Sequence, residues 1–165
     1  MNLIDKINEM TEKEFMSIFG NVFEKTNWIA QKTYAFKPFK NYDQLCSKML
    51  DIFENATKEK CLKIFNLHPS LVIEKILTND SKKEQNSASL DQCSEEEIRE
   101  FTELNEEYKK KFLFPFIIAV KGKNKKEILN NFRQRITNNI NLEFIEAKKQ
   151  VKKIASLRLN EINIK

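Results

Sequence analysis

The sequence predicts an all-α protein, and three observations support this prediction. The 165 residues include only 2 glycines and 3 prolines, whereas β-sandwiches and barrels need many turn residues. Apolar residues recur at helical spacing in most segments. The sequences Thr11-x-x-Glu14 and Ser94-x-x-Glu97 are typical of helix capping boxes. We therefore expect a single-domain compact helical bundle over residues 1–165.

In the first half of the chain, each predicted helix is bounded by a capping or breaking residue. The expected helical segments are 1–10, a helix after Thr11 that ends at Gly20, 24–30, 42–55 and 57–66. The last of these is expected to stop before His68-Pro69. Proline lacks a backbone N–H and disfavours helical geometry in the residue before it.

In the second half, helices are expected over 81–90, 94–112, 125–138 and 142–162, with a turn at Gly122. The most apolar segment of the chain, 112–120, contains Pro115, and its periodicity is compatible with either an extended segment or a buried helix. An irregular backbone there would offer hydrogen-bonding N–H and C=O groups in an environment shielded from water. Such groups suit a heterocyclic ligand that is itself rich in N–H and C=O.

The net charge of +5 permits binding to a nucleic acid or a small anion. However, lysines and glutamates are mixed throughout, as on solvated helix faces, and aromatic residues are not interleaved with the basic runs. We therefore expect solvated helix faces and no nucleic-acid partner.

The cysteines and the apolar segments indicate the cellular compartment of the protein. The 3 cysteines are odd in number and widely spaced, which favours free thiols in a reducing environment. The N-terminal residues lack the apolar run of a signal peptide, and the longest apolar stretch is too short to cross a bilayer. These features predict a cytoplasmic protein without a membrane partner.

His68 is the only histidine and lies between two predicted helices. A lone imidazole cannot belong to a multi-histidine metal site. Its unperturbed pKa near neutrality makes it the natural proton carrier of this chain. At a helix break the side chain can point into a cleft, but these residues by themselves favour a surface histidine at a helix end.

Ser81, Glu84 and Gln85 would project from one face of a helix, because they are spaced i, i+3 and i+4. They would then present a hydroxyl, a carboxylate and an amide together. The alternative is a capping box in which Ser81 is the N-cap residue. The two interpretations are compatible, since a cap can also present Glu84 to a pocket.

Arg158 continues an apolar stripe on the last predicted helix. The stripe consists of Phe144, Ala147, Val151 and Ile154. A charged group on a core-facing stripe needs a partner, because an unpaired buried charge is very costly. Arg158 could bind an anion, or it could reach solvent or pair with a glutamate. Arg135, next to Ile136, is expected to be structural and to tie helices together.

Taken in order from Phe19 to Leu159, these segments resemble the 2-oxo-4-hydroxy-4-carboxy-5-ureidoimidazoline (OHCU) decarboxylases of urate breakdown. The matching motifs are Phe19-Gly20-Asn21-Val22-Phe23-Glu24, Lys37-Pro38-Phe39, Leu67-His68-Pro69-Ser70-Leu71, Ser81-Lys82-Lys83-Glu84-Gln85, Leu104-Asn105-x-x-Tyr108, Phe112-Leu113-Phe114-Pro115-Phe116, Arg135-Ile136-x-Asn138, Glu143 and Ile154-Ala155-x-Leu157-Arg158-Leu159. Each motif is short, but their joint order and spacing are specific.

The resemblance implies a helical fold of that type and decarboxylation to (S)-allantoin, with neither cofactor nor metal. It makes His68 the acid/base residue, has Glu84 hold the histidine or the substrate, and has Arg158 hold the anionic or carbonyl side of the substrate. The residues implied to line the site are Pro69, Ser81, Gln85, Phe116, Ile117, Ile118, Ala119 and Val120. The resemblance also implies a small-molecule substrate, the ureidoimidazoline, and a homodimer.

Three positions depart from the family pattern. Leu113 stands where the family usually has glycine, and Val72 and Ser89 replace glycine or other small residues. The segment between His68 and Ser81 is also shorter than usual. Two alternatives therefore remain: a non-catalytic helical interaction module and a basic nucleic-acid-binding protein, whose affinity would fall steeply with salt.

Overall fold

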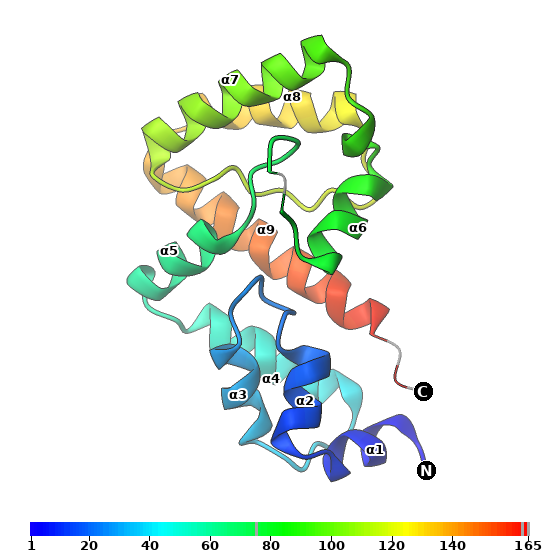
Figure 1. The fold of residues 1–165 in the computed structure, drawn as a ribbon. Coiled ribbons are helices and arrows are strands. Elements are labelled where there is room, and N and C mark those ends of the chain that lie inside the picture. The colour runs from blue at the N-terminus through cyan, green and yellow to red at the C-terminus, as the bar shows by residue number, and fades with distance from the viewer. Residues whose placement is uncertain (75, 163, 165) are drawn as a thin grey trace. The chain divides into compact units, whose positions relative to one another are not determined.

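The computed structural model describes residues 1–74, 76–162 and 164, and all regular secondary structure in this part of the chain is helical (Figure 1). The elements are α1 (Leu3–Glu9), α2 (Glu12–Phe19), α3 (Trp28–Tyr34), α4 (Tyr42–Glu54), α5 (Lys58–Leu67), α6 (Asn79–Ser87), the 3₁₀ helix η1 (Leu90–Gln92), α7 (Glu95–Phe112), α8 (Lys125–Arg135) and α9 (Ile140–Glu161). The all-α prediction is thus confirmed.

The chain divides into two compact units, each described here by itself. The first unit comprises Met1–Ile64 with Lys152–Lys165, of which residues 163 and 165 lie outside the described part. The second unit comprises Phe65–Val151. The expectation that residues 1–165 form a single domain stays a prediction.

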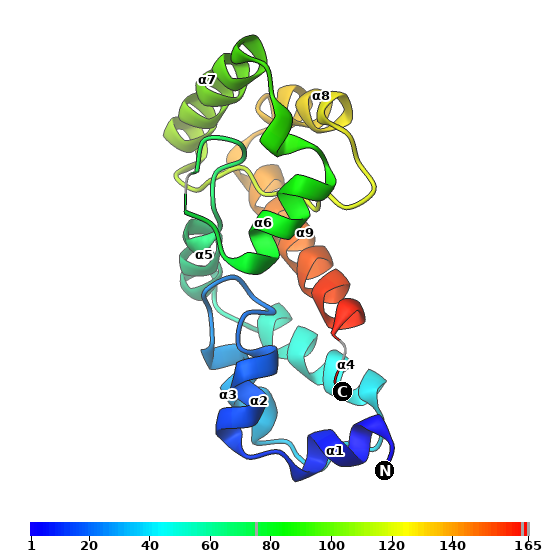
Figure 2. The same cartoon turned by 45° about the vertical axis from the view of Figure 1, so that its right-hand side comes forward.

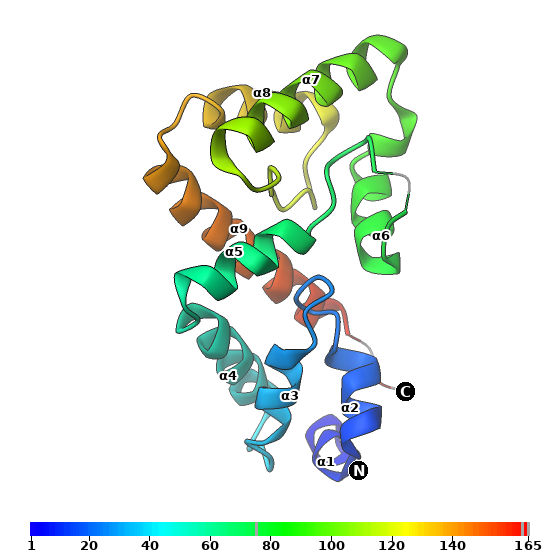
Figure 3. The same cartoon turned by 60° about the vertical axis from the view of Figure 1, so that its left-hand side comes forward.

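The first unit is built from α1 to α4 and the adjoining parts of α5 and α9. Helix α3 packs against both α2 and α4, as Figure 3 shows. Phenylalanines fill its core, with the rings of Phe15 and Phe19 4.5 Å apart and those of Phe23 and Phe53 4.9 Å apart. Such ring pairs stabilise a core beyond the apolar area they bury.

In the second unit, α7 and α8 lie side by side (Figure 2). The 3₁₀ helix η1 packs against α6. The apolar segment 114–120 is fully buried and has no regular secondary structure. Its Phe116 ring stacks on Phe132 of α8 at 3.8 Å and meets Tyr108 of α7 edge-on at 5.4 Å. The helix interpretation of this segment is therefore wrong. It is an irregular, extended core segment, with Pro115 near its start.

The capping predictions are mostly confirmed. Thr11 and Ser94 each form a complete capping box, with Glu14 and Glu97 respectively. For α6 the predicted cap is wrong, because Thr78 is the N-cap residue and its hydroxyl accepts a hydrogen bond from the Ser81 N–H at 3.2 Å. Thr78 has extended backbone geometry and offers the same chemistry three residues earlier.

The three departures from the family pattern share one backbone property. Val72, Ser89 and Leu113 have φ values of 70°, 59° and 64°. This left-handed region suits glycine, because a side chain there brings Cβ close to the following carbonyl oxygen. Leu113 ends α7, where its N–H bonds to the Lys109 carbonyl oxygen, and its side chain is 73% exposed.

We expect Leu113→Gly to raise the free energy of unfolding. Relief of left-handed strain contributes about 1–2 kcal/mol, and the greater chain entropy of unfolded glycine offsets part of it. The net gain should be about 0.5–1 kcal/mol, measurable by urea denaturation. Leu113→Ala is the matched control. It removes the exposed side chain but retains Cβ, so an equal gain in that variant would contradict the strain explanation.

Candidate active site

His68 occupies the end of α5. The helix stops at Leu67, the His68 N–H bonds to the Phe65 carbonyl oxygen at 3.1 Å, and Pro69 follows. The predicted helix break is therefore confirmed. The histidine is only 9% exposed, so the interpretation as a surface histidine is wrong. The backbone of His68 is therefore fixed by the helix end before it and by Pro69 after it.

A tight turn follows His68-Pro69. The Ile73 N–H bonds to the Leu71 carbonyl oxygen at 2.8 Å across Val72, whose φ is 70°. This is the geometry of a γ-turn of the rare, strained kind. Backbone strain of this kind persists where the surroundings over-determine it, and it clusters at functional sites.

Two side chains from other helices hold this turn. The Gln85 Oε1 of α6 accepts a hydrogen bond from the Val72 N–H at 3.2 Å, and the Asn105 Nδ2 of α7 donates to the Leu71 carbonyl oxygen at 3.0 Å. Helices α6 and α7 therefore fix the backbone immediately after the histidine. Our sequence analysis did not single out Asn105, although its place in the Leu-Asn-x-x-Tyr motif was the available signal.

The polar face predicted on α6 is present. Ser81 and Gln85 are buried and Glu84 is half-buried. The Gln85 Nε2 is a buried donor without a hydrogen-bond acceptor in the described part of the chain. A buried donor of this kind is costly unless a water molecule or a ligand satisfies it, so Gln85 can offer an N–H to a ligand oxygen.

A cavity of about 410 Å³ lies beside this face in the second unit. Val72, Leu77, Lys82, Gln85, Asn86 and Leu90 are among its lining residues. Gln85 is the predicted site residue that lines it. His68, Glu84 and Ser81 do not, so the cavity by itself does not define a catalytic centre.

The irregular segment Phe116–Val120 is anchored by two side chains. The Ile117 carbonyl oxygen accepts from Arg135 Nη1 at 2.6 Å, and the Ala119 N–H donates to Gln150 Oε1 at 2.9 Å. The Ile118 peptide lies between these anchors and has no hydrogen bond within the described residues. The segment thus combines a rigid backbone with peptide groups that a ligand can use.

Behind this segment lies a buried ionic network centred on Glu143. Its carboxylate accepts hydrogen bonds from Arg135 Nε at 2.6 Å, from the Tyr108 hydroxyl at 2.6 Å and from Asn138 Nδ2 at 3.1 Å. The Arg135 guanidinium also lies 4.4 Å from the centre of the Phe116 ring. Burial, together with the hydrogen bond to Glu143, raises the pKa of Tyr108, which keeps its hydroxyl protonated. The structural role expected for Arg135 is confirmed.

Arg158 belongs to the first unit and is buried there. Its Nη2 donates to Glu24 Oε2 at 2.7 Å, and its Nη1 donates to the Asn21 carbonyl oxygen at 2.8 Å. Glu24 is fully buried. Of the alternatives for this arginine, pairing with a glutamate is therefore present. The two hydrogen bonds also fix the orientation of the guanidinium.

Comparison with known proteins identifies the family. The family model described as OHCU decarboxylase matches residues 8–160. This chain belongs to the OHCU decarboxylase family.

Relatives include the uric acid degradation bifunctional protein of Bacillus sp. (strain TB-90), which is 38% identical over 98% of this chain and 32% of that protein. The 2-oxo-4-hydroxy-4-carboxy-5-ureidoimidazoline decarboxylase of Haloferax volcanii is 35% identical over 96% of this chain and 94% of that protein. The chain thus spans about a third of the length of the Bacillus protein.

Two solved structures share the fold. The crystal structure of (S)-allantoin synthase superposes with a TM-score of 0.79 at 24% identity, covering 98% of this chain and 53% of that chain. The crystal structure of an OHCU decarboxylase in the presence of (S)-allantoin gives a TM-score of 0.71 at 25% identity, covering 86% of this chain and 94% of that chain.

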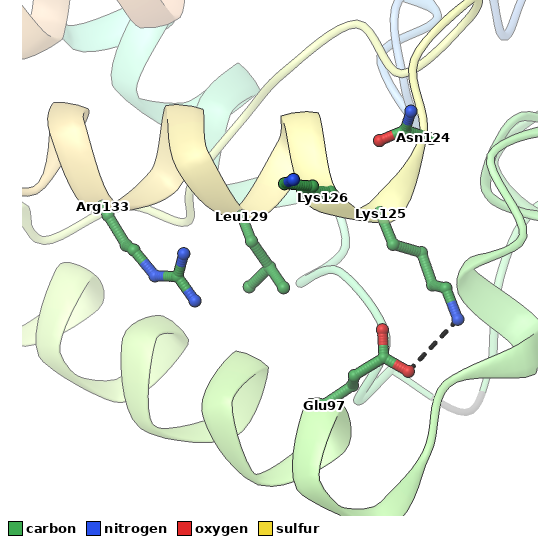
Figure 4. Close-up of a pocket in the computed structure, with 6 residues that line it drawn as sticks. All are labelled: Glu97, Asn124, Lys125, Lys126, Leu129 and Arg133. Carbon is green, nitrogen blue, oxygen red and sulfur yellow. Dashed lines mark hydrogen bonds and ion pairs between the residues drawn. The ribbon is translucent and has the colours of Figure 1, made fainter.

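Another hollow of the second unit, between α7 and α8, contains no predicted site residue of this family member (Figure 4). Lys125 Nζ pairs with Glu97 Oε1 at 3.2 Å, and Arg133 pairs with Glu100. Hydrogen bonding from the Ser94 N–H and from Lys125 lowers the pKa of Glu97. Lys125 and Arg133 are therefore already paired, and because no residue predicted for the active site lines this hollow, it is not a candidate active site.

The described part of this family member contains neither a cluster suited to a metal ion nor a helix suited to crossing a membrane. No group of three or more histidine, cysteine, aspartate or glutamate side chains there is arranged to hold a metal ion. None of the helices described has the length and apolar character needed to cross a membrane.

We expect Asn105→Leu to lower the free energy of unfolding by about 1–3 kcal/mol, because the buried Leu71 carbonyl loses the Asn105 donor that holds the turn. Urea denaturation measures this change. Asn131→Leu is the control, since the half-buried Asn131 donates a solvent-exposed hydrogen bond to the Glu127 carbonyl oxygen of its own helix. Equal losses in the two variants would contradict a special role for Asn105.

Proposed function

We propose that this protein catalyses the cofactor-independent decarboxylation of 2-oxo-4-hydroxy-4-carboxy-5-ureidoimidazoline to (S)-allantoin in urate breakdown. The observation that carries the proposal is the family match over residues 8–160, which includes the buried His68. The Haloferax volcanii relative, nearly all of whose length is covered, bears the name of this decarboxylase. We extend the proposal to a homodimer, as the family resemblance implies, and to a cytoplasmic location, as the cysteine pattern favours.

The substrate supplies its own electron sink. The carbon that carries the carboxylate also carries a hydroxyl and adjoins a ring C=N. When the bond to the carboxylate breaks, CO₂ leaves, its electron pair forms a C=C bond to the former imine carbon, and the imine nitrogen takes a proton, which leaves an enol. The former imine carbon then takes a proton on one face, and the hydroxyl loses its proton to become the ring carbonyl. Because the imine accepts the electrons, this route needs no external cofactor.

His68 is proposed as the acid/base group that delivers the proton to one face. Positioned proton transfer of this kind contributes on the order of 10²–10⁴-fold. Glu84 is proposed to hold the histidine or the substrate. Arg158, already oriented by Glu24, is proposed to hold the substrate's anionic or carbonyl side.

The remaining proposed contacts bind and shape the substrate. Gln85 would donate its Nε2–H to a substrate oxygen, since that donor has no acceptor in the described part of the protein. Ser81 and Pro69 would line the site. The backbone of Phe116–Val120 would meet the ring's own N–H and C=O groups, with Ile118 central to this contact. A planar heterocycle is well matched by rigid backbone donors and acceptors.

The direct test is to generate the unstable ureidoimidazoline in situ from urate and to follow allantoin by circular dichroism, with and without this protein. We expect faster formation of one enantiomer than in the spontaneous reaction, which yields a racemate. A rate and a dichroism signal equal to the spontaneous reaction would overturn the proposal and favour the non-catalytic interaction module.

A further inference from the structure

The first unit contains a hollow of its own, and none of the proposed catalytic residues lines it. Its volume is about 570 Å³, within the range of small-molecule pockets. It is formed by α3, α4, the start of α5 and the residues that connect them. The lining side chains that carry the argument are Trp28, Lys32, Phe36, Lys48, Asp51 and Lys60.

Three ammonium groups converge on this hollow from three different helices. Lys32 and Lys60 lie 5.2 Å and 5.0 Å from the ring centre of Trp28, and Lys48 lies 4.1 Å from the ring centre of Phe36. None of the three lysines forms an ion pair with an acidic side chain in the part of the chain that the structure describes. Asp51 is the acidic lining residue, so the lining carries a net charge of +2.

Two aromatic rings add an apolar wall to this positive hollow. Phe36 is 51% exposed, which is unusual for a phenylalanine, and Trp28 is half-buried. The first residues of α5 border the same space, where the helix dipole adds partial positive charge. Contacts of lysines with exposed rings are weak, at about 0.5–1 kcal/mol, so an anion can recruit these ammonium groups.

We propose that this hollow binds a small organic anion that consists of a planar ring carrying a phosphate or a carboxylate. The ring packs on Trp28 and Phe36, where stacking on an aromatic side chain contributes about 1–3 kcal/mol. The anionic group is held by Lys32, Lys48 and Lys60. This hollow shares no lining residue with the proposed decarboxylation site.

Trp28 makes the site directly observable, because it is the only tryptophan in the chain. Titration with adenosine monophosphate, a ring phosphate, and with orotate, a ring carboxylate, should change its fluorescence saturably for at least one of them. The tighter ligand then identifies the anionic group. Adenosine lacks the charge and inorganic phosphate lacks the ring, so each should bind at least about tenfold more weakly. Added salt should weaken binding, because Lys32 and Lys60 are exposed and Lys48 is only half-buried.

Variants that remove a single lysine charge test whether the ligand binds in this hollow. Lys48→Gln and Lys60→Gln should each weaken binding of the tighter ligand several-fold, whereas Lys13→Gln should not, because Lys13 is an exposed lysine of α2 outside the hollow. Three results would overturn the proposal: no saturable change with either ring anion, equal binding of the uncharged or ring-free probe, or equal weakening by Lys13→Gln.

Discussion

Replacing His68 by asparagine is expected to lower the decarboxylation rate constant by about 10²–10⁴-fold, the usual contribution of a positioned proton donor. Asparagine keeps a polar side chain of similar size but cannot exchange a proton near neutral pH. Without facial protonation by the protein, the enol is protonated by water from either side. The handedness of the allantoin product should therefore fall together with the rate.

The measurement is the in situ assay from urate, followed by circular dichroism and by total allantoin formed. Lys63→Gln is a suitable control, because Lys63 is an exposed residue of the same helix whose ion pair with Glu59 lies at the surface. It should retain the wild-type rate and handedness. Full rate and full stereoselectivity in His68→Asn would show that the assigned role is wrong.

The largest effect on stability is expected from Glu143→Leu. Glu143 is fully buried and accepts hydrogen bonds from three side chains of the second unit. Its loss leaves the Arg135 guanidinium, itself 7% exposed, without its carboxylate. Breaking a buried ion pair by removing one partner typically costs about 3–5 kcal/mol. The free energy of unfolding in urea should fall by about this amount.

The exposed pair between Arg133 and Glu100 provides the comparison in the same unit. Glu100→Gln should cost less than about 1 kcal/mol, as is usual for surface ion pairs. If Glu143→Leu does not fold, Glu143→Gln preserves the side-chain shape while removing the charge, and it should still be destabilised more than Glu100→Gln. Equal losses in the two glutamine variants would contradict the importance of burial.

Much of the helical structure could be predicted because helix boundaries depend on neighbours in the sequence. The capping boxes at Thr11 and Ser94 and the break at Pro69 involve residues within four positions of one another. The error at α6 has the same local origin, because Thr78 and Ser81 both carry a hydroxyl suited to a cap. Propensity alone could not choose between them.

The candidate site was only partly predictable. The spacing of Ser81, Glu84 and Gln85 correctly placed them on one helix face. Their sequence could not reveal that Gln85 and Asn105 hold the strained turn after His68, since the turn is 13 residues from one and 34 from the other. Likewise, the family resemblance identified Val72, Ser89 and Leu113 as unusual, but their left-handed backbone is visible only in the structure.

The amino-acid sequence alone was sufficient to predict the helical class, the family and the candidate chemistry of His68. Periodicity, capping and motif order depend only on the order of residues and on neighbours close in the sequence. Tertiary structure alone decided which charges are paired. Arg158 meets Glu24 across 134 residues, and Glu143 meets Tyr108 across 35. Such pairings depend on how distant helices pack, and burial then makes each pairing obligatory because an unpaired charge in the core is too costly.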